Sequence, residues 1–125
     1  MKVRIVVILL IFVNVMFSQE KKCLDFKTGT FSYNNPALKR FKVVRKENIQ
    51  IETDTVTGSI VEGSIEWKSD CNYVLTYTKI TIKVLEKLLG QTINVEIANI
   101  SGNTILCKTE GFGRKVDLEM TKVDN

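Results

Sequence analysis

A run of alternating apolar and polar side chains in the middle of the chain most strongly limits what this sequence can fold into. From Ser64 to Trp67, and again from Cys71 to Tyr77, larger apolar side chains occupy every second position. Residues 68–70 between the two runs are of types that favour turns. Because successive side chains of a strand point to opposite faces, the pattern predicts a β-hairpin. Its inner face carries the only tryptophan, Trp67, and we expect the core to form around it.

Segments with the same alternation flank this hairpin on both sides. Turn-favouring residues separate them, for example at Asn34-Asn35-Pro36 and at Gly111-Phe112-Gly113. The predicted strands lie at residues 25–33, 41–46, 49–53, 64–67, 71–77, 92–98, 104–109 and 115–121. The sequence therefore predicts an antiparallel all-β fold of about eight short strands, as a small barrel or a strongly curved sheet.

One segment departs from the two-residue period. Ile82, Leu85 and Leu89 lie at helical spacing, and Gly90 follows them as a natural helix end. This spacing predicts one short helix near residues 81–89. The β-branched residues at the start of the segment are also compatible with an extension of the preceding strand.

Two glycines interrupt the expected strands. Gly29, in the first strand, predicts a bulge or a close approach of another part of the backbone. The pattern Gly-Ser-Ile recurs at Gly58 and Gly63, and its odd spacing would place Ile60 and Ile65 on opposite faces of a regular strand. Either residues 58–62 form a separate short strand, or a bulge at Gly63 restores the alternation.

The start of the chain has the layout of a secretory signal peptide. Two basic residues precede an apolar run that extends from Ile5 to Phe17. This run is shorter than the roughly 20 residues that a helix needs to cross a bilayer, which disfavours an uncleaved anchor. We therefore predict a signal peptide at residues 1–18, a single β domain at residues 19–125, and a periplasmic or secreted location. Membrane contact is expected only through the signal peptide.

The chain contains three cysteines, Cys23, Cys71 and Cys107. In an oxidising compartment we expect one disulfide and one free thiol, and three pairings are possible. We favour Cys23–Cys71, because this bond would tie the N-terminal end of the mature chain to the central hairpin. Cys107 follows Ile105 and Leu106 and is predicted to be a buried free thiol.

The motif Cys23-x-Asp25-Phe26-Lys27-Thr28-Gly29-Thr30-Phe31, followed by Trp67-x-x-x-Cys71-x-Tyr73-x-Leu75, resembles a family of small exported proteins of Bacteroidetes-type bacteria. The resemblance covers residues 23–77 well and the C-terminal third weakly. Both cysteines of the family pattern are matched, which supports their pairing. Some members carry a DNA topoisomerase IV label, but this sequence has no acidic metal-binding cluster beside a nucleophilic tyrosine.

The pattern is also similar to that of lipocalin-type small barrels. These barrels have a Gly-x-aromatic motif on the first strand and a tryptophan in the core. The usual Gly-x-Trp is here Gly29-Thr30-Phe31. The resemblance implies a lipocalin-like barrel.

The charge of the chain does not indicate a nucleic-acid partner. The net charge is +4 over 125 residues, and two of the positive charges lie in the predicted signal peptide. The segment from Lys39 to Lys46 is rich in basic residues, but Glu47, Glu52 and Asp54 follow closely. We interpret it as the solvated face of a strand. Residues 111–115 fit a hairpin turn better than a phosphate-binding loop, because no helix begins after them.

The sequence lacks histidine, which excludes a Ser-His-Asp triad, a Cys-His pair and most zinc sites. Asp117 and Glu119 alternate onto the expected outer face, where carboxylates are ordinary surface charges. We therefore predict that the protein is not an enzyme. We also predict no catalytic residues, no metal site and no cofactor.

Aromatic side chains are the candidates for a binding site. Phe31, Tyr33, Trp67, Tyr73 and Tyr77 would either line a ligand cavity or fill the barrel. Because the mature chain is short for a cavity-bearing barrel, we favour a filled interior.

These observations predict an exported, non-catalytic binding module of the periplasm or cell envelope. Its partner is expected to be a small apolar ligand or an envelope protein. The alternative is a structural or interaction component of the envelope that acts through a sheet edge or its outer face.

Overall fold

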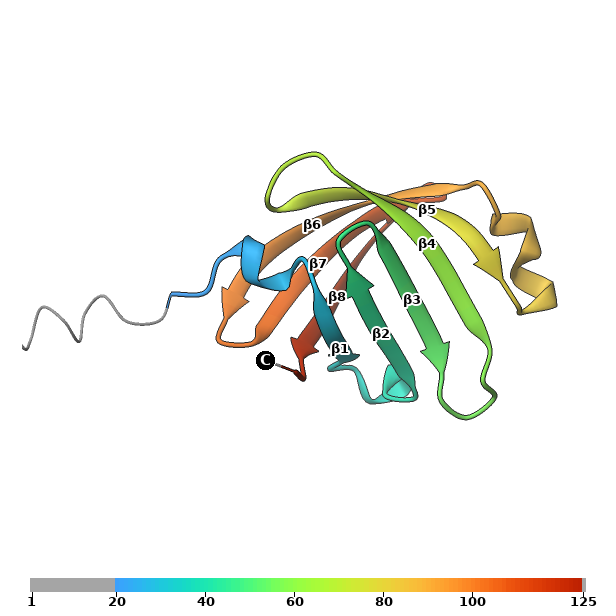
Figure 1. Cartoon of the computed structure of the whole chain (residues 1–125), viewed down its shortest axis with the longest axis horizontal. Helices are drawn as coiled ribbons and strands as arrows, with labels where there is room; N and C mark the ends of the chain where they lie inside the picture. The colour runs from blue at the N-terminus through green and yellow to red at the C-terminus, as the bar shows by residue number, and fades with distance from the viewer. Residues whose placement is uncertain (1–19, 125) are drawn as a thin grey trace, which may run out of the picture.

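The strands form a closed ring in a computed structural model that describes residues 20–124. Each strand pairs antiparallel with the next along the chain, and the last pairs with the first, so the fold is an eight-stranded up-and-down barrel (Figure 1). The strands are β1 (Gly29–Tyr33), β2 (Phe41–Lys46), β3 (Ile49–Asp54), β4 (Ile60–Trp67), β5 (Asn72–Ile80), β6 (Thr92–Ser101), β7 (Thr104–Gly111) and β8 (Arg114–Lys122). The predicted all-β antiparallel class is confirmed.

Three 3-10 helices connect or precede the strands, namely η1 (Cys23–Phe26), η2 (Pro36–Leu38) and η3 (Lys83–Leu88). The helix expected near residues 81–89 is therefore present, as η3. The first predicted strand is too long, because residues 23–26 belong to η1. The Asp25 carboxylate accepts a hydrogen bond from the Lys22 backbone nitrogen at 2.8 Å, and this contact favours the helical turn over an extended chain.

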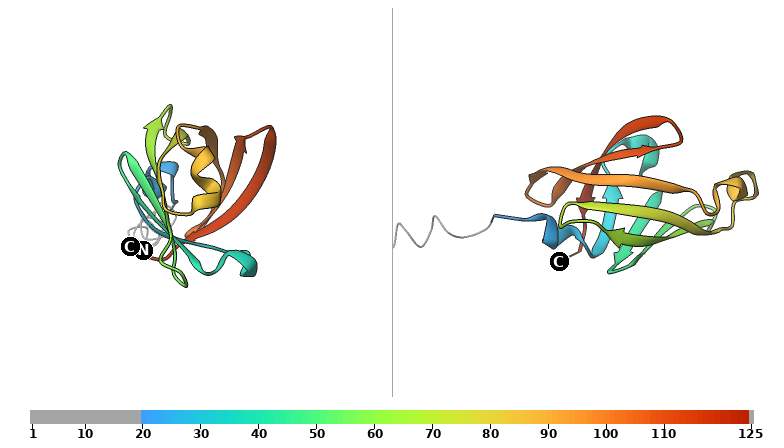
Figure 2. Two further views of the ribbon diagram at one scale, coloured as in Figure 1. Left: turned by 90° about the vertical axis from the view of Figure 1, so that its right-hand side faces the viewer. Right: turned by 90° about the horizontal axis from the view of Figure 1, so that it is seen from above.

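The two ends of the barrel differ. The closed end carries η1, the β2–β3 turn and the β4–β5 turn. The open end carries the connections at residues 34–40, 55–59, 81–91 and 112–113. Seen along the barrel from the open end, η3 lies in front of the ring of strands and η1 lies behind it (Figure 2, left).

A disulfide joins Cys23 of η1 to Cys71 of the β4–β5 turn, with a Cα–Cα distance of 5.2 Å. The predicted pairing is confirmed. The bond holds η1 against the closed end of the barrel. Cys107 on β7 is free and buried, also as predicted.

The tryptophan lies at the edge of the core and not at its centre. Phe26 and Phe31 are fully buried in it, whereas Trp67 only packs against its edge. Trp67 is the last residue of β4, at the closed end, and its indole Nε1 donates to the Glu47 carbonyl oxygen at 2.8 Å. The hairpin contributes Ile65, Tyr73 and Leu75 to the core as expected, but the prediction that Trp67 lies at the centre of the core is wrong. An inward-facing side chain at the final residue of a strand reaches the rim of the barrel and not its middle.

The pairing of β4 with β5 shifts between Glu62 and Gly63, so an irregularity lies where the sequence placed it, but it does not bring Ile60 and Ile65 to one face. Glu62 pairs with Lys79 and Gly63 pairs with Tyr77, which leaves Thr78 as an extra residue on β5. β4 is continuous, so a separate strand at residues 58–62 is wrong. A Cβ atom on Gly63 would lie 2.6 Å from Leu75 Cδ1, so a larger residue here would force Leu75 to move.

Within residues 20–124, no helix is long and apolar enough to cross a membrane. The predicted signal peptide at residues 1–18 lies outside the described residues.

Candidate ligand-binding cavity

The barrel encloses a cavity of about 310 Å³. A second cavity of about 330 Å³ lies toward the open end and shares part of its wall with the first, including Tyr33, Glu52 and Val61. The expectation of a filled interior is therefore wrong. The largest fully buried side chains, Phe31 and Arg45 among them, fill the closed half of the barrel. Gly63 and Gly111 line the cavity and contribute no side chain to fill it.

Arg45 forms the floor of this cavity and is only 1% exposed. Its Nη1 donates to the Phe26 carbonyl oxygen at 2.7 Å, its Nη2 to the Tyr73 hydroxyl at 3.1 Å, and its Nε to the Gln50 side-chain oxygen at 3.2 Å. The guanidinium also lies 4.5 Å from the Phe31 ring centroid and 5.1 Å from that of Tyr73. These contacts compensate the cost of burying the charge.

The solvated-face interpretation of residues 39–46 is wrong for Arg45, although the lysines at 42 and 46 are exposed as expected. Val43 and Arg45 are the buried positions of β2 and lie two residues apart. The alternation of the strand therefore carried a signal for the inward position of Arg45. The segment was nevertheless interpreted as solvated because so many of its residues are basic.

Glu52 and Tyr33 form a second polar group, on the wall that the two cavities share. The Tyr33 hydroxyl donates to Glu52 Oε1. Burial raises the pKa of the Glu52 carboxyl above its usual range, although the hydrogen bond from Tyr33 partly offsets this effect. Burial, reinforced by the nearby Glu52 charge, raises the pKa of Tyr33 as well. Sequence reasoning missed Glu52, because its strand neighbours gave no sign that it faces inward.

The five aromatic candidates separate into three groups. Tyr33, Tyr73 and Tyr77 line the cavity. Phe31 is fully buried beside Arg45 and belongs to the core. Trp67 lies outside the cavity, in a shallow depression at the closed end with Lys27 4.9 Å from its ring centroid.

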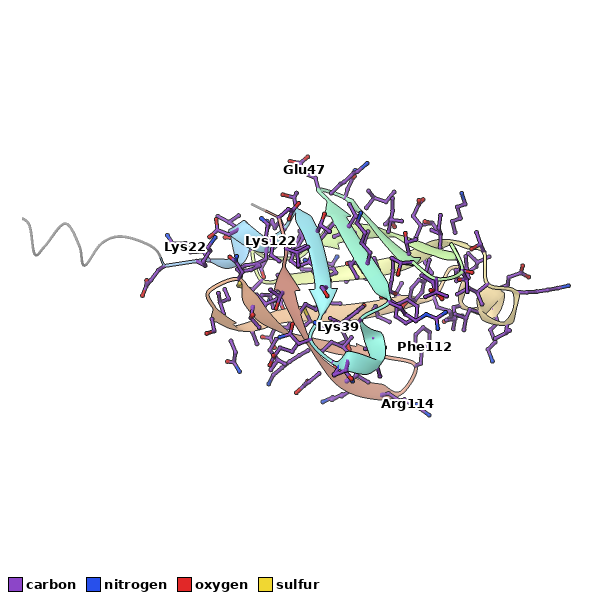
Figure 3. The ribbon with its side chains drawn as sticks, turned by 90° about the horizontal axis from the view of Figure 1, so that it is seen from below. Lys22, Lys39, Glu47, Phe112, Arg114 and Lys122 are labelled. Atoms are coloured by element: carbon purple, nitrogen blue, oxygen red, sulfur yellow. A yellow bond between two sulfur atoms is a disulfide. The ribbon has the colours of Figure 1, made fainter. Side chains whose placement is uncertain are left out.

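Phe112 adds an aromatic side chain at the mouth of the cavity. It lies in the predicted turn between β7 and β8, has a φ of 54°, and remains 52% exposed (Figure 3). Its ring is nearly parallel to that of Tyr77, with centroids 6.3 Å apart. A bulky residue at positive φ is strained, so the turn holds this ring in place at a cost in stability.

Cys107 lies on the cavity wall and donates a hydrogen bond to Met120 Sδ at 3.7 Å. Burial raises the pKa of this thiol above its usual range, so the sulfur stays protonated and weakly nucleophilic near neutral pH. Asp117 and Glu119 are exposed on β8. Among residues 20–124, no three histidine, cysteine or acidic side chains gather as a metal site would require.

Together these features define an eight-stranded up-and-down barrel with an internal cavity that is closed by η1 at one end and accessible at the other. Comparison of the chain with family models, with curated proteins and with solved structures found no match. The resemblance to the exported Bacteroidetes-type family and to lipocalins therefore stays a prediction.

Proposed function

We propose that the protein is an exported, non-catalytic carrier that binds one small, mostly apolar molecule inside the barrel. The observation that carries this proposal is the cavity of about 310 Å³, which is within the range of small-molecule sites. Its wall combines apolar side chains such as Leu75 and Val95 with a few polar groups. Apolar walls with few convergent polar groups are typical of ligand pockets.

The open end supports this proposal. Val56, Val84, Leu89 and Phe112 are exposed large apolar side chains on the connections at this end. Exposed apolar groups around an opening would favour the approach of an apolar ligand. The closed end offers no comparable route, because η1 lies across it and the disulfide holds η1 there.

Export is part of the proposal. The disulfide supports it, because such bonds persist in oxidising compartments. We expect the protein purified from its native host to begin near residue 19, as measured by intact mass. A protein that retains residues 1–18 would contradict cleavage of a signal peptide.

The alternative function, interaction with an envelope partner through a sheet edge, has little support in the fold. The described strands close into a ring, which removes the free sheet edge that edge-to-edge pairing needs. An interaction through the outer face stays a prediction.

Fluorescence of the neutral apolar probe N-phenyl-1-naphthylamine tests the binding proposal. We expect saturable enhancement of its emission by the wild-type protein. Val61 lines both cavities, so Val61→Phe should fill the space and weaken binding at least about tenfold. Val44→Phe is the matched control, because Val44 lies on β2 between the inward-facing Val43 and Arg45 and faces outward.

Absence of saturable probe binding to the folded wild-type protein would refute the carrier proposal. Equal loss of binding in the two variants would also count against it, because the site would then not be the cavity.

A further inference from the structure

We propose that the ligand carries a positively charged amine on an apolar body, and that the Glu52 carboxylate binds this ammonium group. This inference rests on the proposed function, since it assigns the chemistry of the ligand in the same cavity. It follows from how the two charged groups of the interior are paired.

One oxygen of the Glu52 carboxylate has no hydrogen-bond donor among residues 20–124. Tyr33 occupies one carboxylate oxygen, and no other donor among residues 20–124 reaches the side chain. No lysine or arginine of this part of the chain lies within ion-pair distance of it. Every fully buried side-chain oxygen or nitrogen in the described residues has a partner, so the second Glu52 oxygen remains accessible from the cavities. An ammonium group of a ligand would supply the missing donor and the missing charge.

Arg45 is in the opposite situation. Each of its three nitrogens already donates to an oxygen, and its charge lies against two aromatic rings. It is nearly inaccessible, at 1% exposure. An anionic ligand would have to displace these contacts, whereas a cation at Glu52 displaces none.

The aromatic rings near the mouth fit the same ligand. Tyr33, Tyr77 and Phe112 line the first cavity, and the rings of Tyr77 and Phe112 are stacked with their centroids 6.3 Å apart. Ring faces attract organic cations. Arg114 also lies on this wall, but it is exposed, so solvent and salt screen its repulsion of a cation.

The second cavity is more acidic than the first, because neither Arg45 nor Arg114 lines it. Its charged residues are Glu52 and Asp54, and Asp54 is paired with Arg40. Glu52 is therefore the carboxylate that both spaces share, and no lysine or arginine of residues 20–124 pairs with it. A ligand that enters through the open end meets this carboxylate before it reaches the floor at Arg45.

Three indoles of matched shape test the inference by isothermal titration calorimetry at pH 7.4. Tryptamine carries an ammonium group, indole-3-propionate a carboxylate, and 3-propylindole no charge. We expect tryptamine to bind at least about tenfold more tightly than either of the others, as for a charge-assisted hydrogen bond in a partly buried site. Octylamine, octanoate and octanol repeat the comparison with an aliphatic body.

Glu52→Gln keeps an acceptor for Tyr33 and removes the charge. It should weaken amine binding at least about tenfold and leave the neutral compounds nearly unchanged. Asp117→Asn is the matched control, because it makes the same change of charge at an exposed position of β8 and should have no effect.

Each outcome distinguishes the two proposals. Tighter binding of the carboxylates, equal binding within each series, or failure of both amines to bind while N-phenyl-1-naphthylamine binds would overturn the amine inference and leave the carrier proposal standing. Failure of the neutral probe and of all six compounds would overturn both. Because the wild-type comparison does not depend on any variant, a Glu52→Gln protein that fails to fold leaves the test intact.

Discussion

The closed and open halves of the barrel use their side chains differently. At the closed end, Phe26 and Phe31 are fully buried, the Arg45 charge is compensated by three hydrogen bonds, and a disulfide fixes η1. At the open end, Glu52 keeps an unpaired oxygen, and Phe112 is held at positive φ. The closed half holds more of the stabilising contacts, whereas the open half keeps an unpaired carboxylate oxygen and a phenylalanine at positive φ. Asn99, near the closed end, also has a positive φ of 46°, but asparagine tolerates this conformation.

This difference indicates where function lies. Strained backbone and half-satisfied buried charges lower stability, and they persist at sites where a ligand uses them. We therefore expect substitutions at the closed end to lower the free energy of unfolding. Suitable substitutions at the open end should raise it and weaken binding.

The largest effect is expected at the disulfide. Replacing both Cys23 and Cys71 with serine removes a bond between residues 48 positions apart in the sequence. On a chain-entropy estimate this should lower the free energy of unfolding by about 4 kcal/mol, as measured by urea denaturation. The control is Cys107→Ala, which leaves the disulfide intact and should destabilise less. Equal stability of the double variant and the wild type would show that the closed end does not depend on this bond.

A smaller effect of opposite sign is expected at Phe112. Asn favours positive φ before Gly113, so Phe112→Asn should relieve strain on the order of 1–3 kcal/mol. The lost ring contact with Tyr77 costs about 0.5–1.5 kcal/mol, so the net gain in unfolding free energy should be about 1 kcal/mol. Amine binding should weaken in the same variant. A loss of stability would mean that Phe112 supports the fold and not the site.

The smallest effect is expected at Glu52 and depends on pH. Because burial raises its pKa in the folded state, the folded protein holds this proton more tightly than the unfolded chain does. Its contribution to stability is complete below the ordinary carboxyl value of about 4.5 and is lost as the pH rises through the raised value. Glu52→Gln lacks this loss, so its advantage over the wild type should grow with pH in that window and then level off.

Thermal unfolding of the wild type and of Glu52→Gln between pH 4 and pH 8 measures this difference in stability. Tyr33 and Tyr77 also line the cavity around Glu52, but burial raises the pKa of both hydroxyls, so they stay neutral in this range. A constant difference across the range would show that the Glu52 carboxyl does not titrate differently in the folded and unfolded states.

Local pattern was enough to predict most of the fold. The two-residue alternation placed the strands, the turn residues separated them, and Gly63 marked the register change. The end of the first strand was misplaced, because the competition between η1 and an extended chain depends on the Asp25 contact. The Cys23–Cys71 disulfide was favoured among three possible pairings because it would tie the N-terminal end of the mature chain to the central hairpin.

The sequence by itself determined the class of fold and the order of the strands along the chain, because these depend on residue spacing, and it favoured the Cys23–Cys71 pair among three. The tertiary structure alone decided that the barrel holds a cavity, that Trp67 lies at its rim, and that Arg45 and Glu52 face inward. Ring closure brings side chains from every strand into one enclosed space. Whether that space is filled depends on the sum of those side chains, which no single segment contains.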